Sequence, residues 1–380
     1  MTTQRKVLIV QRRMTHYRVP FFNLLKEELN ARDIKLTVAF GDGTINEASK
    51  NDAGHLSWGQ HISNLYLFKG RFCWQSIRRL SQEHDLVVVT HENKLASNLP
   101  LQFLYRKFRV VLWGHGANFQ GKKNSLSERL KRFTARKADW WLAYTNHSVP
   151  LIMDCGFPLE RITTLNNSID ALDLADKIAK SGMAEQTRTR NDHGLMGNNI
   201  GLYLGSLYSE KRLDFLLQAA ERIRATIPDF ELLIVGDGPQ RQEIAAFCAK
   251  TPWASYAGAL SGQQKANALA ISKVMLNPGL VGLGILDSFV SGTPMITTDC
   301  GLHSPEIAYL ESGSNGLMTP NTVEEFAKMA VEVFKSPNLR QHLKSGCLES
   351  AQRYSLNNMA TNFASGIVRC LESPAFRHKQ

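Results

Sequence analysis

A glycine-rich passage in the second half of the chain has residue types that suit phosphate binding. An apolar run ends at Leu276, glycines follow at positions 279, 282 and 284, and helical spacing then continues to Gly292. We predict a strand, a loop and a short helix that ends at this last glycine. A glycine lets backbone N–H groups approach phosphate oxygens, and a helix N-terminus adds positive potential. The loop Gly282-Leu283-Gly284 therefore suits a pyrophosphate, although a tight turn that binds nothing also fits.

Charged residues near predicted helix starts are the next candidates. Asp287 falls in the first turn after the loop, where a carboxylate either holds ribose hydroxyls or only complements the helix dipole. In Gly205–Asp214, Ser209 is suited to an N-cap, which places Lys211 and Arg212 in a first helical turn. The dipole disfavours cations there, so these side chains either hold an anion between them or are simply solvated.

Two further turns follow the same strand-to-helix plan. Ile234–Pro239 has a glycine turn and a proline suited to a first helical position. Cys300–Ile307 contains His303, and its Ser304 is predicted to cap a helix. Glu306 then either complements that helix dipole or reaches a bound sugar.

The first half offers fewer candidates. His115 lies between Gly114 and Gly116 at the end of a predicted strand, where open α/β sheets bind ligands. A lone histidine is usually structural, but the flanking glycines expose this one. Tyr17 and Arg18 follow the first predicted strand and are similarly placed near an inter-domain cleft.

Composition bounds the class of protein. The 380 residues exceed one ordinary domain, so we expect two. Residues 1–168 hold 25 Lys and Arg against 13 Asp and Glu, while the remainder holds 20 against 21. This basic half either faces something anionic, such as lipid headgroups, phosphate or nucleic acid, or is merely soluble. The six cysteines form no CxxC pair, which favours free thiols over a disulfide framework or a zinc site. No apolar run approaches the ~18 residues of a membrane span, and the opening run Val7–Val10 suits a strand, so we expect a cytoplasmic protein.

Residues 122–137 form a separate basic segment with seven basic residues and one acid. Leu126, Leu130 and Phe133 fall at helical spacing within it. The segment is either a surface helix that dips this apolar stripe into an anionic membrane, or an ordinary helix packed on its own sheet. The first interpretation predicts a peripheral location on the inner face of the plasma membrane.

Short apolar runs alternate with helix-length segments through both halves, which predicts parallel βαβ units in two doubly wound, Rossmann-like α/β domains. The expected strands are 6–10, 35–40, 86–90, 110–113, 140–144 and 162–165, then 201–204, 231–235, 254–257, 274–276 and 294–297. We expect an N-terminal domain over 1–170, a linker over 171–200, a C-terminal domain over 201–355, and a helix and tail over 356–380.

The order of these passages resembles that of GT-B fold glycosyltransferases of the retaining family-4 type. Gly205–Asp214 is similar to the family's G-R-L-x-x-E-K-G-x-D segment, Ile234–Pro239 to its V-G-D-G-P turn, and Pro278–Gly292 to its E-G-F-G helix entry. The family's P-E corresponds to Pro305-Glu306, and the first half adds Tyr17–Phe22 and Trp113–Gly116. The resemblance covers most of residues 200–320 and looks closest to bacterial enzymes of surface-polysaccharide assembly.

The resemblance implies two domains facing across a cleft and retaining transfer of a sugar from a nucleotide-diphosphate sugar to a saccharide or lipid-linked saccharide, with no metal, no other cofactor and no nucleic-acid partner. It implies catalytic roles for His115, Lys211 and Glu306. It implies an acceptor side at Tyr17 and Arg18, and donor binding by Ser206, Arg212, Gly282, Leu283, Gly284, Asp287 and His303.

The chain departs from the family pattern at two places. Ser206 takes the first cation position, so phosphate neutralisation falls to Lys211 and Arg212. Of two glutamates spaced eight apart, the second is Asp287 and the first falls at Gly279. Three alternatives stay open: a same-fold epimerase or phosphorylase, a nucleic-acid-binding protein, and a degenerate transferase acting as a partner subunit. Against nucleic acid, aromatics do not interleave the basic segment and no zinc-finger or RNP-type motif appears.

Overall fold

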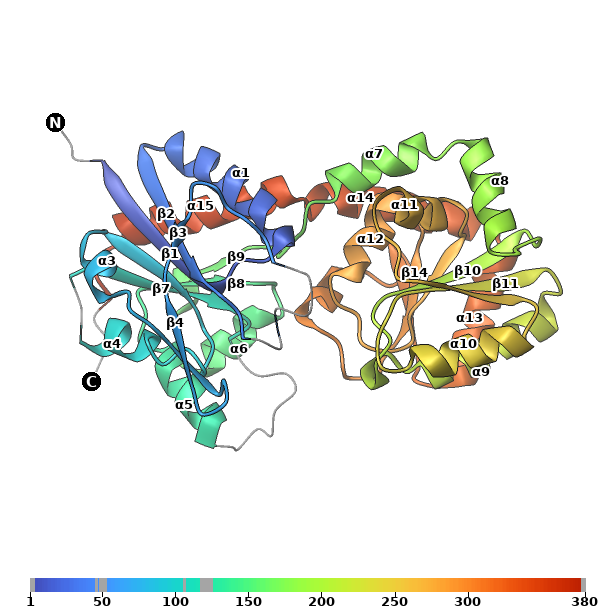
Figure 1. Cartoon of the computed structure of the whole chain (residues 1–380), viewed down its shortest axis with the longest axis horizontal. Coiled ribbons are helices and arrows are strands. Elements are labelled where there is room, and N and C mark those ends of the chain that lie inside the picture. The colour runs from blue at the N-terminus through green and yellow to red at the C-terminus, as the bar shows by residue number, and fades with distance from the viewer. Residues whose placement is uncertain (1–3, 45–46, 48–52, 105–106, 117–125, 377–380) are drawn as a thin grey trace. The chain divides into compact units, whose positions relative to one another are not determined.

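The computed structural model describes residues 4–44, 47, 53–104, 107–116 and 126–376. The chain divides into two compact units (Figure 1). Unit 1 comprises Met1–Ile169 with Leu356–Gln380, and unit 2 comprises Asp170–Ser355. No helix in the described ranges is both long and apolar enough to cross a membrane. The six cysteines are free thiols.

Unit 1 is built on a seven-stranded parallel sheet in the order β3-β2-β1-β6-β7-β8-β9. Its strands are β1 (Arg5–Arg13), β2 (Ile34–Gly41), β3 (Gln60–His61), β6 (Leu86–Thr90), β7 (Arg109–Gly114), β8 (Trp140–Ala143) and β9 (Ile162–Thr164). An antiparallel hairpin of β4 (Asn64–Leu67) and β5 (Phe72–Gln75) stands apart from this sheet. The helices are η1 (His16–Arg18), α1 (Val19–Asn30), α3 (Arg78–Gln82), α4 (Asn98–Phe103), α5 (Leu126–Ala135), α6 (Ser148–Asp154), η2 (Leu159–Arg161) and α15 (Leu356–Glu372).

Alternate residues of β1 supply two hydrophobic cores in unit 1. Val7 and Ile9 belong to one core, which they share with α1 and α15. There Phe21 packs edge-on against Phe363, with ring centroids 5.4 Å apart. Leu8 points to the other core, which includes residues of α4, α5 and α6. Because helices cover both faces, the central strands are apolar along their length.

Unit 2 has a six-stranded parallel sheet in the order β12-β11-β10-β13-β14-β15. Its strands are β10 (Asn199–Leu204), β11 (Phe230–Val235), β12 (Ala254–Gly258), β13 (Val274–Leu276), β14 (Met295–Thr298) and β15 (Gly316–Thr319). Its helices are α7 (Leu172–Lys180), α8 (Met183–Asp192), η3 (Ser209–Lys211), α9 (Leu213–Thr226), α10 (Arg241–Lys250), α11 (Gly262–Ala270), α12 (Gly284–Ser291), η4 (Pro305–Tyr309), α13 (Val323–Lys335) and α14 (Pro337–Arg353).

The two-sheet, Rossmann-like α/β fold expected from the apolar runs is confirmed. Each expected strand is present, with ends shifted by at most three residues. The short strands β3, β4 and β5, and the strand β15, were not expected. The C-terminal helix α15 (red in Figure 1) packs on α1 and belongs to unit 1. The residues that directly precede α15 in the sequence belong to unit 2.

The expectation of a linker over 171–200 differs from the structure. These residues form α7 and α8 within unit 2, and β10 begins at Asn199. Helix α8 is polar, and the only residue it buries is Thr189. The sequence of α8 therefore lacks the apolar stripe by which a helix is normally recognised.

The predicted helix start at Ser209 is also wrong. Ser209–Lys211 is a 3-10 turn, and α9 begins only at Leu213. Arg212 separates the two because its backbone is left-handed, with φ 56°. Lys211 and Arg212 therefore precede the helix instead of lying in its first turn, and the dipole argument made for them does not apply.

A histidine in the core of unit 1 generates a prediction about pH. His91 is buried, stacks edge-on against Trp141 at 4.9 Å, and has its Nε2 3.0 Å from Thr134 Oγ1. Burial, and then the charge of Lys131, lowers the pKa of His91 to about 3. The unfolded imidazole, with a pKa of about 6.5, gains a proton on acidification while the folded one does not, so acid favours unfolding.

We predict that His91 alone reduces the free energy of unfolding by about 2 kcal/mol between about pH 6.5 and about pH 5. Urea unfolding at the two pH values measures this loss in the wild type. In His91→Asn the loss should be smaller by that amount. Equal pH dependence in the two proteins would contradict the prediction.

Candidate functional site

Unit 2 contains a cavity of about 500 Å³ at the carboxyl ends of its strands. Its walls come from the segments that follow β10, β11, β12 and β13, the edge where open α/β sheets bind ligands. The lining residues are Leu204, Gly205, Ser206, Tyr208, Lys211, Val235, Gly236, Asp237, Ala259, Leu260, Lys265, Asn277, Leu280, Gly282, Leu283, Gly284, Asp287 and Ser304. Both passages predicted to grip phosphate, the 209–211 turn and the 282–284 loop, thus contribute to one cavity.

Lys211 is one of two lysines in the wall of this cavity, beside Lys265. Its side chain is buried, and its Nζ donates a 2.5 Å hydrogen bond to Leu280 O, in the segment just before the glycine loop. Burial lowers the pKa of Lys211 to about 8. An ammonium has three donors, so it keeps capacity for an anion beside this bond. The structure therefore holds a positive charge against the loop.

A close backbone approach fixes the loop against the 209–211 turn. Leu280 N–H donates to Glu210 O at 2.9 Å. A Cβ atom at Gly279 would lie 2.4 Å from both the carbonyl carbon and oxygen of Lys211. Any side chain at position 279 would therefore push the two segments apart.

Gly282 and Gly284 differ from Gly279. A Cβ atom at Gly282 would come no closer than 3.5 Å to Ser304 Oγ, and one at Gly284 would meet only Leu204 O at 4.0 Å. Neither glycine has a positive φ. Packing and backbone conformation therefore do not require glycine at these positions. Close approach of a ligand to the backbone would require it.

His303 supports the glycine loop from behind. Its Nδ1 accepts from Val281 N–H at 3.1 Å, and its Nε2 donates to Thr298 O at 2.8 Å. Burial lowers the pKa of His303, which keeps the ring neutral and in this one tautomer. His303 is not among the cavity-lining residues, so its predicted contact with a donor stays a prediction.

Arg212 is also outside the cavity wall. Its Nη1 donates to Pro278 O at 3.3 Å, to Thr298 Oγ1 at 3.2 Å and to Asn321 Oδ1, and its guanidinium stacks over Phe215 at 4.4 Å. These contacts hold the start of the glycine passage. Direct donor binding by Arg212 stays a prediction, as does that by Ser206, which does line the cavity.

The acidic candidates lie in different surroundings. Asp287 lines the cavity, and its Oδ1 is 2.7 Å from Lys265 Nζ. Burial raises the pKa of Asp287, and the charge of Lys265 opposes that rise. Glu306 is buried in η4 and does not line the cavity. Its predicted catalytic role remains a prediction.

The candidates of unit 1 gather at the carboxyl ends of its strands. Arg18 is buried under aromatic rings, with its guanidinium 5.0 Å from the Trp113 ring and 5.4 Å from the Tyr17 ring. Its Nη2 donates to Asn167 Oδ1 at 3.1 Å. His115 packs edge-on against Tyr144 at 4.2 Å. Burial, then the charges of Lys131 and Arg18, lowers the pKa of His115 to about 4, so its ring is neutral at physiological pH. Ala117 and Asn118, which follow it, lie outside the described residues.

Sequence reasoning missed several cavity residues, of which Lys265 is the most consequential. Lys265 belongs to α11, which carries no recognisable motif, and only the fold brings it to Asp287. Asn277 directly precedes the glycine passage, so its position beside Pro278 was a usable signal. Tyr208, whose ring lies 5.6 Å from Lys211 Nζ, had none beyond its place in the turn.

The ion pair between partly exposed Lys265 and buried Asp287 leads to a stability prediction. Removing one partner leaves an uncompensated buried charge, whereas removing both does not. We predict that Lys265→Met lowers the free energy of unfolding by about 3 kcal/mol and that adding Asp287→Leu restores most of it. Chemical denaturation of the four proteins in the mutant cycle measures this. Simple additivity of the two changes would show that the ion pair carries no coupling.

Comparison with known proteins identifies the architecture. Residues 198–336 match the family model described as "Glycosyl transferases group 1". Alpha-D-kanosaminyltransferase of Streptomyces kanamyceticus is 23% identical over 195 residues, or 49% of this chain and 49% of that protein. The chain thus matches about half the length of this curated relative.

Solved structures with the same fold cover nearly the whole chain. Anabaena HepE in complex with UDP superposes with a TM-score of 0.71 at 14% identity, over 96% of this chain and 99% of that one. The lipopolysaccharide outer core galactosyltransferase WaaB superposes with a TM-score of 0.66 at 18% identity, over 96% and 99%. With its two parallel sheets, the chain has the GT-B fold of these solved structures, and its residues 198–336 match the group 1 glycosyltransferase family.

Proposed function

We propose that the chain transfers a hexose from a nucleotide-diphosphate sugar to a saccharide, or a lipid-linked saccharide, with retained anomeric configuration and without a metal ion. Surface-polysaccharide assembly is the setting that this chemistry fits. The family match supports nucleotide-sugar transfer, and HepE has been solved in complex with UDP-glucose. The cavity of unit 2 has the size and wall polarity that a nucleotide-sugar needs.

One observation carries the proposal. Gly282 and Gly284 have no positive φ and have room for a side chain, yet both are glycine and both line the same cavity as Lys211. A diphosphate that accepts hydrogen bonds from the loop backbone needs glycine at these positions, because a side chain would block its approach. A strand-to-helix turn that binds nothing would not need glycine there.

The proposed mechanism is electrostatic. As the bond to the sugar breaks, the leaving diphosphate gains negative charge and the sugar becomes oxocarbenium-like. Lys211 and the loop N–H groups stabilise that charge from fixed positions. Asp287 holds the ribose and Glu306 acts at the sugar, while the catalytic role that the resemblance implies for His115 stays a prediction. A donor phosphate oxygen accepts the proton of the incoming hydroxyl, so the chain supplies no dedicated base.

A peripheral membrane location completes the proposal. Over residues 129–135, the part of α5 whose side chains are described, Leu130 and Phe133 are exposed and Thr134 and Ala135 are buried. Phe133 stacks on Phe103 of α4, with centroids 5.6 Å apart. The helix therefore keeps part of its apolar stripe in solvent, among the cations of the basic segment. Residues 122–125 and the side chain of Leu126 lie outside the described part of the chain.

Lys211→Ala tests the proposal. Loss of the fixed cation should lower kcat/KM roughly a hundredfold or more, because it removes charge stabilisation made mainly in the transition state. Turnover is followed by mass spectrometry, with UDP-glucose and other nucleotide-sugars offered to a lipid-linked acceptor pool. Unchanged turnover would refute the role of Lys211.

Lys273→Ala is the matched control. Lys273 Nζ donates to Asn199 Oδ1 at 3.0 Å, and the residue directly precedes β13, away from the cavity. This variant should transfer at the wild-type rate. Thermal melting of both variants separates catalysis from folding. Conversion of the donor sugar without an acceptor would favour the same-fold epimerase.

A further inference from the structure

The two faces of the β4–β5 hairpin in unit 1 differ in polarity. Its strands pair antiparallel, with Leu65 opposite Trp74 and Leu67 opposite Phe72. Because successive side chains alternate, these four residues share one face. The opposite face carries Asn64, Tyr66, Cys73 and Gln75.

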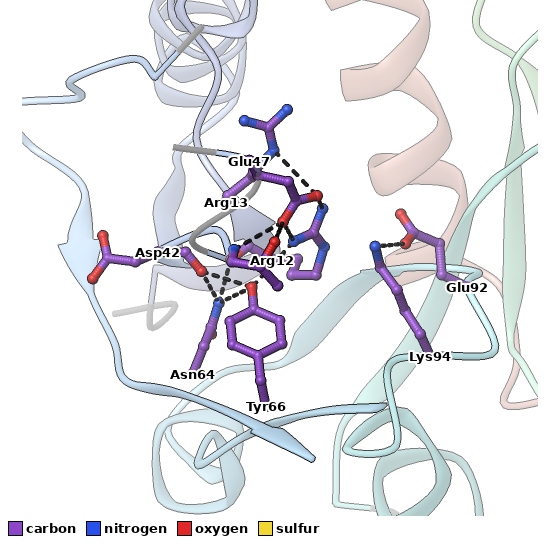
Figure 2. Close-up of polar contacts among 9 residues, drawn as sticks. Arg12, Arg13, Asp42, Glu47, Asn64, Tyr66, Glu92 and Lys94 are labelled. Atoms are coloured by element: carbon purple, nitrogen blue, oxygen red, sulfur yellow. Dashed lines mark hydrogen bonds and ion pairs between the residues drawn. The ribbon is translucent and has the colours of Figure 1, made fainter. Parts of the chain in front are cut away.

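The polar face is the one turned toward the protein. Asn64 Nδ2 donates to Arg12 O at 2.6 Å and to Asp42 O at 2.7 Å, and Tyr66 Oη donates to Asp42 O at 2.7 Å (Figure 2). Gln75 Nε2 donates to Gln11 O at 3.1 Å. The inner face of the hairpin is thus fixed by hydrogen bonds to the ends of β1 and β2.

An ion pair reinforces this attachment. The guanidinium of Arg12 binds Glu47 through both Nη atoms, at 2.7 and 2.6 Å, and its Nη1 also donates to Tyr66 Oη at 3.1 Å (Figure 2). The hydrogen bond from Arg12 holds the pKa of Glu47 well below its usual range. The hairpin is therefore held in one orientation, with its other face outward.

The outward face is apolar and exposed. The exposed fractions are 57% for Leu65, 43% for Leu67, 44% for Phe72 and 42% for Trp74. Phe68, at the turn, is 74% exposed and packs edge-on against Phe72 at 6.0 Å. A half-buried antiparallel sheet normally places apolar residues inside and polar residues outside, so this hairpin is inverted. A contiguous apolar surface of this kind marks a binding surface.

The turn places an aromatic ring at a strained position. Phe68 and Lys69 both have left-handed backbones, with φ of 51° and 56°. Asn and Gly adopt such angles readily, whereas a bulky residue does so at a cost. The most exposed point of the hairpin thus carries a Phe where folding alone would favour Asn or Gly.

The charged residues around the apolar face of the hairpin indicate which binding partner it suits. Residues 60–80 contain Lys69, Arg71, Arg78 and Arg79 and no Asp or Glu. The nearby carboxylates each lie beside a basic side chain other than Lys69 and Arg71: Asp42 beside His61, Glu92 beside Lys94 and Glu83 beside Arg79. A second copy of this surface would bring like charges together. An anionic lipid surface offers both a partner for the cations and an apolar layer for Trp and Phe.

We propose that the outward face of the β4–β5 hairpin docks the chain on an anionic lipid bilayer. Phe68, Phe72 and Trp74 enter the boundary between headgroups and acyl chains, while Lys69 and Arg71 meet the headgroup phosphates. This inference deepens the proposed membrane location by assigning a second surface to it, apart from α5. It requires no property of the cavity in unit 2.

Co-flotation with vesicles tests the proposal. The full chain should float with vesicles of phosphatidylglycerol and phosphatidylcholine and not with pure phosphatidylcholine. Phe68→Asn combined with Phe72→Thr should weaken binding at least roughly tenfold, because two large apolar groups no longer enter the bilayer. Asn suits the left-handed turn and Thr suits a strand, so the variant keeps the hairpin and should melt no lower than the wild type.

Matched controls come from unit 2. Met183→Ser with Met196→Ser removes two residues that are more than four-fifths exposed, and should leave flotation unchanged. Lys69→Glu with Arg71→Glu should abolish flotation, whereas Lys180→Glu with Arg188→Glu, an equal charge change at exposed positions on α7 and α8, should reduce it only slightly.

Brominated phosphatidylcholine, mixed into the same anionic vesicles, gives a second readout. Its quenching of tryptophan fluorescence should be largely lost in Trp74→Phe. Three results would overturn the proposal: no flotation of the wild type, flotation lost only in Leu130→Ser with Phe133→Ser of α5, or a hairpin variant that changes oligomeric state but not flotation. UDP binding, measured by calorimetry on the same variants, should not change, so failure of this inference is separable from failure of the proposed function.

Discussion

The cavity of unit 2 depends on the close approach of two backbone segments, residues 210–211 and residues 279–280. Leu280 N–H donates to Glu210 O, and the Lys211 ammonium donates back to Leu280 O, so the segments are joined in both directions. Gly279 makes the approach sterically possible. Without it, the cation would not be held beside the Gly282–Gly284 loop, and the two elements that we propose bind the diphosphate would not share a wall.

The electrostatics of the cavity follow from that contact. Among the described residues, burial alone lowers the pKa of Lys211, with no carboxylate offsetting the shift. Asp287 has its own cation in Lys265, and His303 is neutral and committed to backbone groups. The ammonium is therefore costly to bury without a counter-charge. An incoming diphosphate would supply the counter-charge, which gives a physical reason for preferring an anionic ligand.

The sequence predicted the two sheets well because their strands are continuous apolar runs, which parallel sheets covered on both faces require. Its failures have physical causes. Helix α8 has almost no apolar face, so its residues were interpreted as a linker. Arg212 has a left-handed backbone, so α9 begins only after it. An arginine in the sequence gives no indication of that backbone conformation.

The residues of the candidate site were also predicted only in part. Lys211, Gly282, Gly284 and Asp287 were found from motifs in the sequence. The structure brings these four residues to one cavity. Lys265 was missed because its relation to Asp287 exists only in three dimensions. The β4–β5 hairpin was missed because its polar residues, not its apolar ones, face the protein, and a period-two pattern does not say which face is inward.

The central claim is that Lys211 meets the diphosphate of the donor, and proton uptake tests it most directly. With a pKa of about 8, part of Lys211 is uncharged in the free protein at about pH 8.5, and a bound diphosphate should recharge it. Calorimetry of UDP binding at that pH, in buffers of different ionisation enthalpy, should show uptake of roughly half a proton or more per UDP, lost in Lys211→Met. Binding of UDP without proton uptake, or with the same uptake in the variant, would contradict the account.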